Sequence, residues 1–380
     1  MKVALWVAYK YFYINPRHSR VGKLITDMLT LPIHMLRIDW QEIFRFAAHC
    51  RDHGYKHTLL DAFISYFKYG SSIKQFYRYR FYEKKERERA KWITERVMSS
   101  FIYFMNPPKY EKLALDKIQT YGLLGEFMRR DVLLLADESD LEKAIQWSST
   151  KREFVIKPRF GWCGEGVEFV EYTDEANLRR FLTEKLRSGP QIIEEVIEQH
   201  PVMNHLYPDS VNTIRIQTIL KDDDVLILGA QLRIGNGSRV DNMSAGGIAA
   251  AVDTNSGKVI SNGFFHDITK TNSLSSHPLS GHIIRGFIVP CWEETISLVK
   301  RMARKVTVFK TIGWDIAITP SGPILVEINR EWMTGTFQIP YETGRLDDLL
   351  PYMDKRYLYP VHKKYISKRN EKFRIDSKSQ

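Results

Sequence analysis

The sequence predicts an α+β fold in which a mainly helical N-terminal region precedes a mixed, largely antiparallel body. Apolar residues recur at three- and four-residue spacing through residues 18–105, in stretches such as WQEIFRFAAHC and LLDAFISYF, without any strand alternation. From about residue 110 onward, short alternating strand patterns mix with helical ones. Because the strand patterns do not follow a regular βαβ order, an α+β body is favoured over a parallel sheet.

Three regions follow from this change of pattern. We expect a helical, basic N-terminal lobe at 1–105, an α+β body at 106–350 and a basic C-terminal tail at 351–380. The elements expected in the body are helices at 110–124, 174–186 and 291–306, strands at 153–157, 167–171, 191–197, 211–220, 225–234 and 247–253, and a hairpin at 313–332.

The positive charge of the chain is concentrated at its ends. The formal net charge is +11, residues 1–110 hold 20 Lys and Arg against 9 Asp and Glu, and residues 355–380 hold 9 against 2. Basic ends on a mildly acidic middle predict contact with an anionic surface or substrate. Residues 69–92 interleave aromatic and basic side chains, as membrane-surface and nucleic-acid binders do. A helical lobe with aromatic side chains in its core and charges in water is the favoured alternative, because KKERERAK has the pattern of a charge-balanced helical face.

Several classes of protein are disfavoured. No apolar run reaches the roughly 18 residues that a membrane span needs, and the opening stretch MKVALWVAYKYFY lacks a small-residue cleavage site, so we expect a cytoplasmic protein. Cys50, Cys163 and Cys291 are widely spaced and odd in number, which indicates buried free thiols rather than a disulfide framework or a zinc site.

The hairpin carries three oxygen-bearing side chains in apolar surroundings. The turn Pro320-Ser321-Gly322-Pro323 separates two alternating runs, which can place Asp315 opposite Leu325, Glu327 and Asn329 on one face. Two carboxylates and an amide in a half-buried place suit Mg²⁺, because like charges there need a cation. The alternative is that each carboxylate pairs with a Lys or Arg of the surrounding sheet.

Two further stretches can bind a nucleotide. The strand EFVIK ends in Lys157 and is followed by Gly161, Gly164 and Gly166, and a lysine before a glycine-rich loop can hold phosphate oxygens. A glycine-rich surface hairpin is the alternative. The strand in QIIEEVIEQH ends in several acidic residues. Such a strand end can contact the adenine edge and the ribose hydroxyls of a nucleotide. The alternative is that these acidic side chains are exposed to solvent.

Two arginines lie inside predicted strands. Arg215 alternates with isoleucines in SVNTIRIQTIL, and Arg233 ends the strand of AQLRIGNGSRVDNMSAGGI before a glycine-rich loop. Strand arginines usually form surface ion pairs. Two of them on neighbouring strands that face the acidic hairpin favour a catalytic role more than a single arginine would, and surface ion pairs stay the alternative.

The order of these motifs resembles the ATP-grasp superfamily over about residues 106–335. The resemblance is greatest to its sugar-transfer associated branch, through SVNTIR, LRIG with the following VDN and GG, and GWDIA with VEIN. It implies two α+β subdomains that clamp ATP, so that 106–350 would be the nucleotide-binding and catalytic region. Many members begin with an alternating β/α domain, whereas this N-terminal region is predicted to be helical.

The resemblance also implies roles for individual residues. Lys157 and Lys117 are similar to the family lysines that contact the nucleotide phosphates, together with the glycine loop. Glu195, Val196 and Ile197 would meet adenine, and Glu198 would contact ribose. The implied catalytic residues are Arg215 and Arg233, and the implied Mg²⁺ ligands are Asp315, Glu327 and Asn329.

The activity implied by the resemblance is ADP-forming carboxylate–amine ligation through an acyl phosphate, with ATP and Mg²⁺ as cofactors. The implied substrates are a sugar acid or glycan and an amine or amino acid, in bacterial surface polysaccharide (capsule) biosynthesis. The basic ends agree with peripheral binding of the protein to the anionic inner face of the membrane. Nucleic acid is not an expected partner. The alternatives are a kinase of the same fold that acts on a sugar hydroxyl and a non-catalytic accessory protein that binds polysaccharide or membrane.

Overall fold

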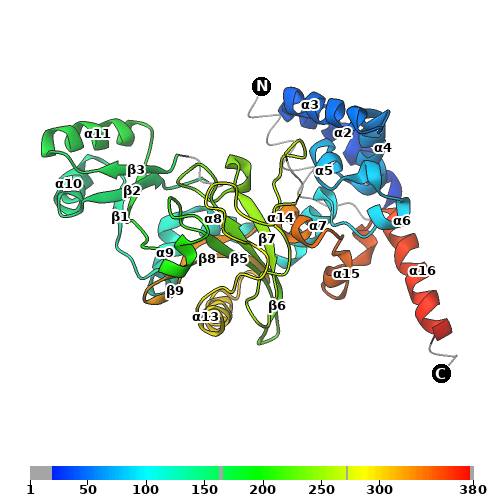
Figure 1. Ribbon diagram of the computed structural model, residues 1–380. Coiled ribbons are helices and arrows are strands. Elements are labelled where there is room, and N and C mark those ends of the chain that lie inside the picture. The colour runs from blue at the N-terminus through cyan, green and yellow to red at the C-terminus, as the bar shows by residue number, and fades with distance from the viewer. Residues whose placement is uncertain (1–18, 162–165, 271–272, 377–380) are drawn as a thin grey trace. The chain divides into compact units, whose positions relative to one another are not determined.

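The computed structural model describes residues 19–161, 166–270 and 273–376 and divides the chain into two compact units. The first comprises Met1–Pro107, Phe264–Leu274 and Met333–Gln380, and the second comprises Pro108–Gly263 and Ser275–Trp332. The predicted α+β fold with a helical N-terminal region is confirmed (Figure 1). The expected domain limits at 105 and 350 stay a prediction, because compactness alone does not show which segments fold independently.

Of the helices and strands assigned to the described residues, those of the first unit are all helices. Tyr69, Phe76, Tyr77 and Phe81 are almost completely buried in it, so the aromatic part of residues 69–92 forms core. The α-helices of this unit are α2 (Arg20–Arg37), α3 (Trp40–Asp52), α4 (Thr58–Tyr69), α5 (Ile73–Arg78), α6 (Glu86–Arg89), α7 (Glu95–Met105), α14 (Thr334–Gln338), α15 (Leu346–Leu349) and α16 (Pro360–Asp376).

The second unit contains two antiparallel sheets. The four-stranded sheet has the order β1-β4-β2-β3 and the five-stranded sheet the order β7-β6-β5-β8-β9. Their strands are β1 (Val132–Leu135), β2 (Glu153–Pro158), β3 (Glu168–Glu171), β4 (Gln191–Glu195), β5 (Thr213–Lys221), β6 (Asp224–Ile234), β7 (Ile248–Val252), β8 (Thr311–Thr319) and β9 (Gly322–Asn329). The helices are α8 (Glu111–Leu115), α9 (Lys117–Met128), α10 (Leu141–Ser149), α11 (Glu175–Arg187), α12 (Pro201–Asn204) and α13 (Trp292–Lys305).

The four-stranded sheet has one apolar face and one polar face. Phe154 and Ile156 of β2 and Ile193 of β4 form a core with residues of α10 and α11, which cover this face (Figure 1). Because side chains alternate along a strand, Lys157 and Glu194 point to the opposite face. Strand β1 was not predicted, since its four residues VLLL show no alternation.

The five-stranded sheet is also two-sided. Ile214 pairs with Leu232 and Ile316 in the sheet, and these buried residues share the apolar face. On the other face Arg215 pairs with Asp315, which pairs in turn with Glu327. The sheet therefore gathers its charged side chains on one surface, as the period of two requires.

The helix predicted at 110–124 is interrupted at Asp116, so the single helix was wrong. Asp116 has an extended backbone, and its carboxylate caps α9 by accepting a hydrogen bond from the Ile118 amide at 3.1 Å. The same carboxylate pairs with Arg159 at 2.6 Å. An aspartate favours a cap over a helix interior, and this cap makes Lys117 the first residue of α9.

Candidate active site

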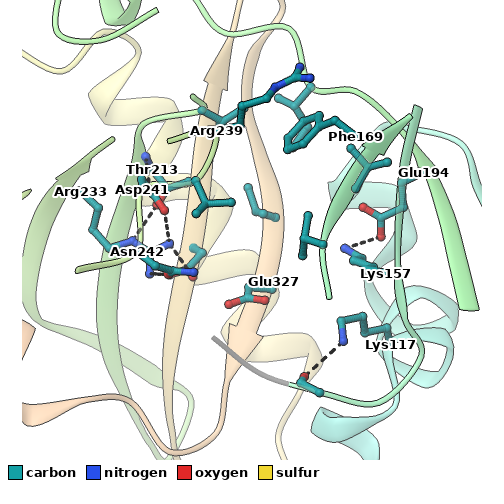
Figure 2. Close-up of a pocket in the computed structure, with 18 of the residues that line it drawn as sticks. Lys117, Lys157, Phe169, Glu194, Thr213, Arg233, Arg239, Asp241, Asn242 and Glu327 are labelled. Atoms are coloured by element: carbon teal, nitrogen blue, oxygen red, sulfur yellow. Dashed lines mark hydrogen bonds and ion pairs between the residues drawn. The ribbon is translucent and has the colours of Figure 1, made fainter. Parts of the chain in front are cut away.

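A cavity of about 150 Å³ lies between the polar faces of the two sheets in the second unit. Figure 2 shows Lys117, Lys157 and Glu194 on one side, Arg233, Asp241 and Asn242 on the other, and Glu327 between the two groups. Charged side chains of both signs and an apolar wall line the cavity, so it suits an elongated, partly anionic ligand.

Two lysines form a cationic corner of this cavity. The Lys117 Nζ donates hydrogen bonds to the carbonyl oxygens of Pro158 at 3.0 Å and Gly161 at 3.2 Å. Lys157 lines the same corner from the end of β2. Burial and the nearby Lys157 lower the pKa of Lys117. An anion placed here would relieve the repulsion between the two ammonium groups.

Part of the glycine-rich segment lies at this cationic corner of the cavity. Gly161 lines the cavity, and Gly166 has φ +71°, where a Cβ would lie 2.8 Å from Pro158 Cγ. A side chain at position 166 would therefore meet both backbone strain and a steric clash. Gly164 and Cys163 lie outside the described residues, so the predicted phosphate contact of Gly164 stays a prediction.

Glu194 is a buried counter-charge that the sequence analysis did not assign. Its carboxylate pairs with Lys157 at 2.7 Å and with Arg130 at 3.1 Å. Burial alone would raise its pKa, but Arg130 and Lys157 outweigh burial and lower the pKa of Glu194 to about 2. The alternation of Glu194 with Ile193 indicates its face, but Arg130 lies 64 residues away and only the fold shows the pairing.

Asp315 is completely buried against two arginines. Both of its carboxylate oxygens accept hydrogen bonds from Arg215, the one from Nη2 at 2.8 Å, and the Nη2 of Arg233 lies 3.1 Å from Oδ2. Burial would raise its pKa, but Arg215 and Arg233 hold the pKa of Asp315 below its usual value. Asp315 thus has the ion pairs of the alternative interpretation, and both predicted catalytic arginines converge on it.

The two arginines differ in their access to the cavity. Arg233 lines it, whereas Arg215 is not among its described lining residues. Arg233 also pairs with Asp241 at 3.1 Å, and its Nε donates a hydrogen bond to the Thr213 hydroxyl at 2.9 Å. Asp241 in turn accepts a hydrogen bond from the Thr213 amide at 2.9 Å. This network holds the guanidinium of Arg233 at the cavity wall.

Glu327 lies on the hairpin beside Asp315, in the predicted register. A bulge between Asp315 and Ile316 leaves Val326 as an extra residue on β9, so Val326 and Glu327 line the cavity while Leu325 is fully buried. The predicted placement of Leu325 beside Glu327 was therefore wrong, because a bulge interrupts the alternation. The pKa of Glu327 is raised above its usual value, because burial and the neighbouring Asp315 outweigh the opposing effect of nearby cationic side chains. These cations are Arg215, Arg233 and Lys157.

These donors suit a hard cation in composition. Glu327, Asp315 and Asn329 offer oxygen atoms on one hairpin, and a cation beside Glu327 would relieve the charge that raises its pKa. The Asn329 amide nitrogen lies 3.4 Å from Asp315 Oδ2, but Asn329 is not among the described lining residues. In the described part of the chain, no three His, Cys, Asp or Glu side chains gather as a metal site. A cation here would therefore also need oxygen atoms from a bound molecule to complete its coordination.

Part of the cavity lining is apolar. Val155, Phe169, Ile197 and Val240 contribute to it, and the adenine contact of Ile197 stays a prediction. Glu195 also lines the cavity and pairs with Lys151. The remaining residues expected here do not line it in the described structure: Val196 is half-buried and Glu198 is exposed.

Arg239 connects the two sides of the cavity and was not predicted. It lies in the loop after β6, its guanidinium stacks 3.7 Å from the centre of the Phe169 ring on β3, and it pairs with Glu153 on β2. Figure 2 shows this stack at the edge of the cavity. A cation on an aromatic face is attractive, so the contact couples the loop to the four-stranded sheet.

Outside the site, Cys50 is a buried free thiol, as expected. Cys291 is also a free thiol but is only partly buried, so the expectation that it is buried was wrong. None of the described helices is long and apolar enough to span a membrane.

A model of a known family matches residues 96–351 of the chain, and its description is sugar-transfer associated ATP-grasp. No curated protein matches the chain.

Three similar solved structures illustrate the remote likeness of the fold. The ATP-grasp ligase PsnB, complexed with a minimal precursor, is 14% identical with a TM-score of 0.38 and aligns over 69% of this chain and 63% of its own. D-alanyl-alanine synthetase A from Vibrio cholerae is 12% identical, with a TM-score of 0.40 over 69% and 68%. The L-amino acid ligase from Bacillus licheniformis is 12% identical, with a TM-score of 0.35 over 58% and 41%. The chain thus spans less than two thirds of the length of PsnB.

Proposed function

Since the chain belongs to the sugar-transfer associated ATP-grasp family, we propose that it is an ADP-forming carboxylate–amine ligase that works through an acyl phosphate. ATP-grasp enzymes are generally ADP-forming ligases, and the fold implies ATP binding. The proposed substrates are a sugar acid or a uronic-acid-containing glycan and an amino acid or amine, in the synthesis of a bacterial surface polysaccharide.

The observation that carries the proposal is the placement of cations on facing walls of one cavity. Lys117 and Lys157 come from the four-stranded side, Arg233 comes from the five-stranded side, and Glu327 lies between them. A triphosphate with its terminal group near Arg233 would find positive charge along its length and a place for a cation at Glu327. The apolar wall with Ile197 and Phe169 would receive the base.

In the proposed reaction, a carboxylate oxygen of the acid attacks the γ-phosphorus of ATP, and the bond to the β-phosphate oxygen breaks to release ADP. The amine then attacks the acyl carbon, phosphate leaves, and the amine loses a proton to solvent. Arg233 would stabilise the charge on the transferring phosphoryl group, since its guanidinium is held at the wall by Asp241, Asp315 and Thr213.

The proposed Mg²⁺ would be held by Glu327, Asp315 and Asn329 together with phosphate oxygens, and it supplies charge neutralisation when bound. Asp315 would remain the anchor of Arg215 and Arg233, because its oxygens already accept their hydrogen bonds. Lys117 and Lys157 would orient the phosphates, and the glycine segment around Gly161 and Gly166 would exclude water from the acyl phosphate.

The proposed setting is the cytoplasm, with the basic ends at the anionic inner membrane surface. Residues 355–380 hold 9 Lys and Arg against 2 Asp and Glu, which supports contact with an anionic lipid or glycan.

Hydroxylamine trapping tests the ligase proposal. The full-length protein is incubated with ATP, Mg²⁺ and a panel of sugar acids, with hydroxylamine in place of the amine, and the products are weighed by mass spectrometry. An acyl phosphate is expected to give a hydroxamate, whereas a kinase would give a phosphate ester that is inert to hydroxylamine. A stable phosphorylated sugar as the sole product would overturn the ligase proposal, and ADP release without any acid would contradict the acyl transfer.

A further inference from the structure

Helix α2 of the first unit presents its apolar side chains outward. Six exposed residues form what we call the α2 apolar face: Val21, Leu24, Ile25, Met28, Leu29 and Leu36, each between 50% and 77% exposed. The buried residues of the same helix are polar: Lys23, Thr26, Asp27 and Thr30. This is the reverse of the pattern of a helix that packs on a water-soluble core, where the apolar side faces inward.

Specific polar contacts hold the helix in this orientation. Asp27 accepts a hydrogen bond from the Tyr359 hydroxyl at 2.9 Å and lies 3.4 Å from the guanidinium of Arg96. The Thr30 hydroxyl donates to the Thr26 carbonyl at 2.7 Å, and Tyr66 lies within hydrogen-bond distance of Thr30 at 3.0 Å. Turning the apolar side inward would break these buried contacts, and an unpaired buried charge costs several kcal/mol. The outward direction of the α2 apolar face is therefore built into the fold.

Positive charge lies next to this face. Leu24 of the α2 apolar face lines a cavity together with Lys68 of α4 and Lys364 of α16. Glu86 pairs with Lys68 at 2.5 Å and lies 3.7 Å from Lys364, so one carboxylate faces two ammonium groups. Lys363 and Lys368 are also exposed on α16. The apolar stripe thus lies beside cations, a combination typical of helices in the plane of an anionic membrane.

We propose that the α2 apolar face docks in the interfacial layer of an anionic lipid bilayer, with α2 parallel to the membrane plane and the lysines of α4 and α16 at the headgroups. A second copy of the chain fits less well, because a symmetric pairing through the α2 apolar face would bring the same cationic side chains together. The docking face is independent of the nucleotide cavity and of the ligase proposal.

Vesicle partitioning of the full-length protein tests this docking. The vesicles contain phosphatidylcholine alone or phosphatidylcholine with an equal amount of phosphatidylglycerol, at low and high salt. The variant Leu24→Gln/Met28→Gln/Leu29→Gln is expected to lose at least about tenfold in partitioning to the anionic vesicles, because three apolar side chains no longer enter the interface. The matched control Leu279→Gln/Ile283→Gln/Ile288→Gln changes equally exposed aliphatic residues of the second unit and is expected to bind like the parent.

Charge is tested separately with Lys364→Gln/Lys368→Gln. This variant is expected to lose about tenfold in binding to anionic vesicles at low salt and almost nothing at high salt, since headgroup attraction is screened. Equal partitioning of the α2 variant and the parent would overturn the proposal. A lower melting temperature of the α2 variant would also overturn it, because the face would then be covered within the chain. The proposal would also be overturned if the parent forms a concentration-dependent dimer that the α2 substitutions abolish and does not bind vesicles.

Discussion

Asp315 lies directly opposite Glu327 across the β8–β9 pair, yet the two carboxylates have different surroundings. Both carboxylates line the cavity, but Asp315 is fully buried and paired with Arg215 and Arg233, whereas Glu327 is half-buried and has a raised pKa. The charge of Asp315 is thus already balanced by protein side chains, whereas the charge of Glu327 would be stabilised further by a bound cation.

The first prediction concerns Glu327→Gln. In the ligand-free protein this change is expected to leave the melting temperature unchanged or slightly higher at pH 8, because it removes a charge that burial and Asp315 disfavour. The sign follows from linkage: a carboxyl with a raised folded pKa loses stability as pH rises through that pKa. Mg²⁺-dependent ATP binding should weaken, as measured by calorimetry with and without Mg²⁺.

The control for this prediction is Glu195→Gln, which alters a lining carboxylate on the side of the cavity where we propose that the base binds. It is expected to leave the ratio of ATP affinities with and without Mg²⁺ unchanged. If the Glu327→Gln protein binds MgATP like the parent, the assignment of Glu327 as a cation ligand is wrong. A marked fall in melting temperature would instead show a structural ion pair at Glu327.

The second prediction concerns Asp315→Asn. Removing this carboxylate leaves the buried guanidinium groups of Arg215 and Arg233 without their shared partner, so the free energy of unfolding should fall by about 3–5 kcal/mol. Urea denaturation measures the loss. The control Glu142→Gln breaks an exposed pair with Arg179 and should leave stability nearly unchanged. Similar stabilities of the two variants would contradict the role of Asp315 as the anchor of both arginines.

The third prediction concerns acid stability. The pKa of Glu194 is about 2 in the folded protein, against 4.5 ordinarily, so its ionised form contributes roughly 3 kcal/mol that is fully present above about pH 4.5. This contribution is lost as pH falls from 4.5 toward 2. Glu194→Gln should therefore be less stable than the parent at pH 7 and approach it near pH 2. Parallel pH profiles of unfolding free energy for the two proteins would disprove the linkage.

The fourth prediction separates the two arginines, with Arg→Lys used so that a positive charge remains for Asp315. Arg233 lines the cavity, so Arg233→Lys should cost about 10²-fold in turnover with little change in ATP affinity, because lysine lacks the guanidinium fork. Arg215 is committed to Asp315, so Arg215→Lys should lower stability more than turnover. Steady-state kinetics with calorimetry measures both. Equal turnover losses, or a parallel loss of ATP affinity in Arg233→Lys, would refute the distinction.

Local patterns in the sequence were sufficient to predict most of the helices and strands and the register of one strand pair. Alternation on both sides of Pro320-Ser321-Gly322-Pro323 predicts the hairpin and places Asp315 opposite Glu327, because a tight turn sets the pairing of adjacent strands. The lysine at the end of β2 and the arginines of β5 and β6 could be found in the same way. The family followed from the order of these motifs and is confirmed.

Only the tertiary structure decided which charges meet and which faces are buried. Arg215 and Asp315 are 100 residues apart, and Arg130 and Glu194 are 64 apart, so no local pattern determines that they pair. The bulge at Val326 and the cap at Asp116 override the periodicity around them. In α2 the sequence by itself determined the helix, since the 3.6-residue period specifies two faces. Which face is buried depended on Arg96, Tyr66 and Tyr359, distant residues that satisfy its polar side.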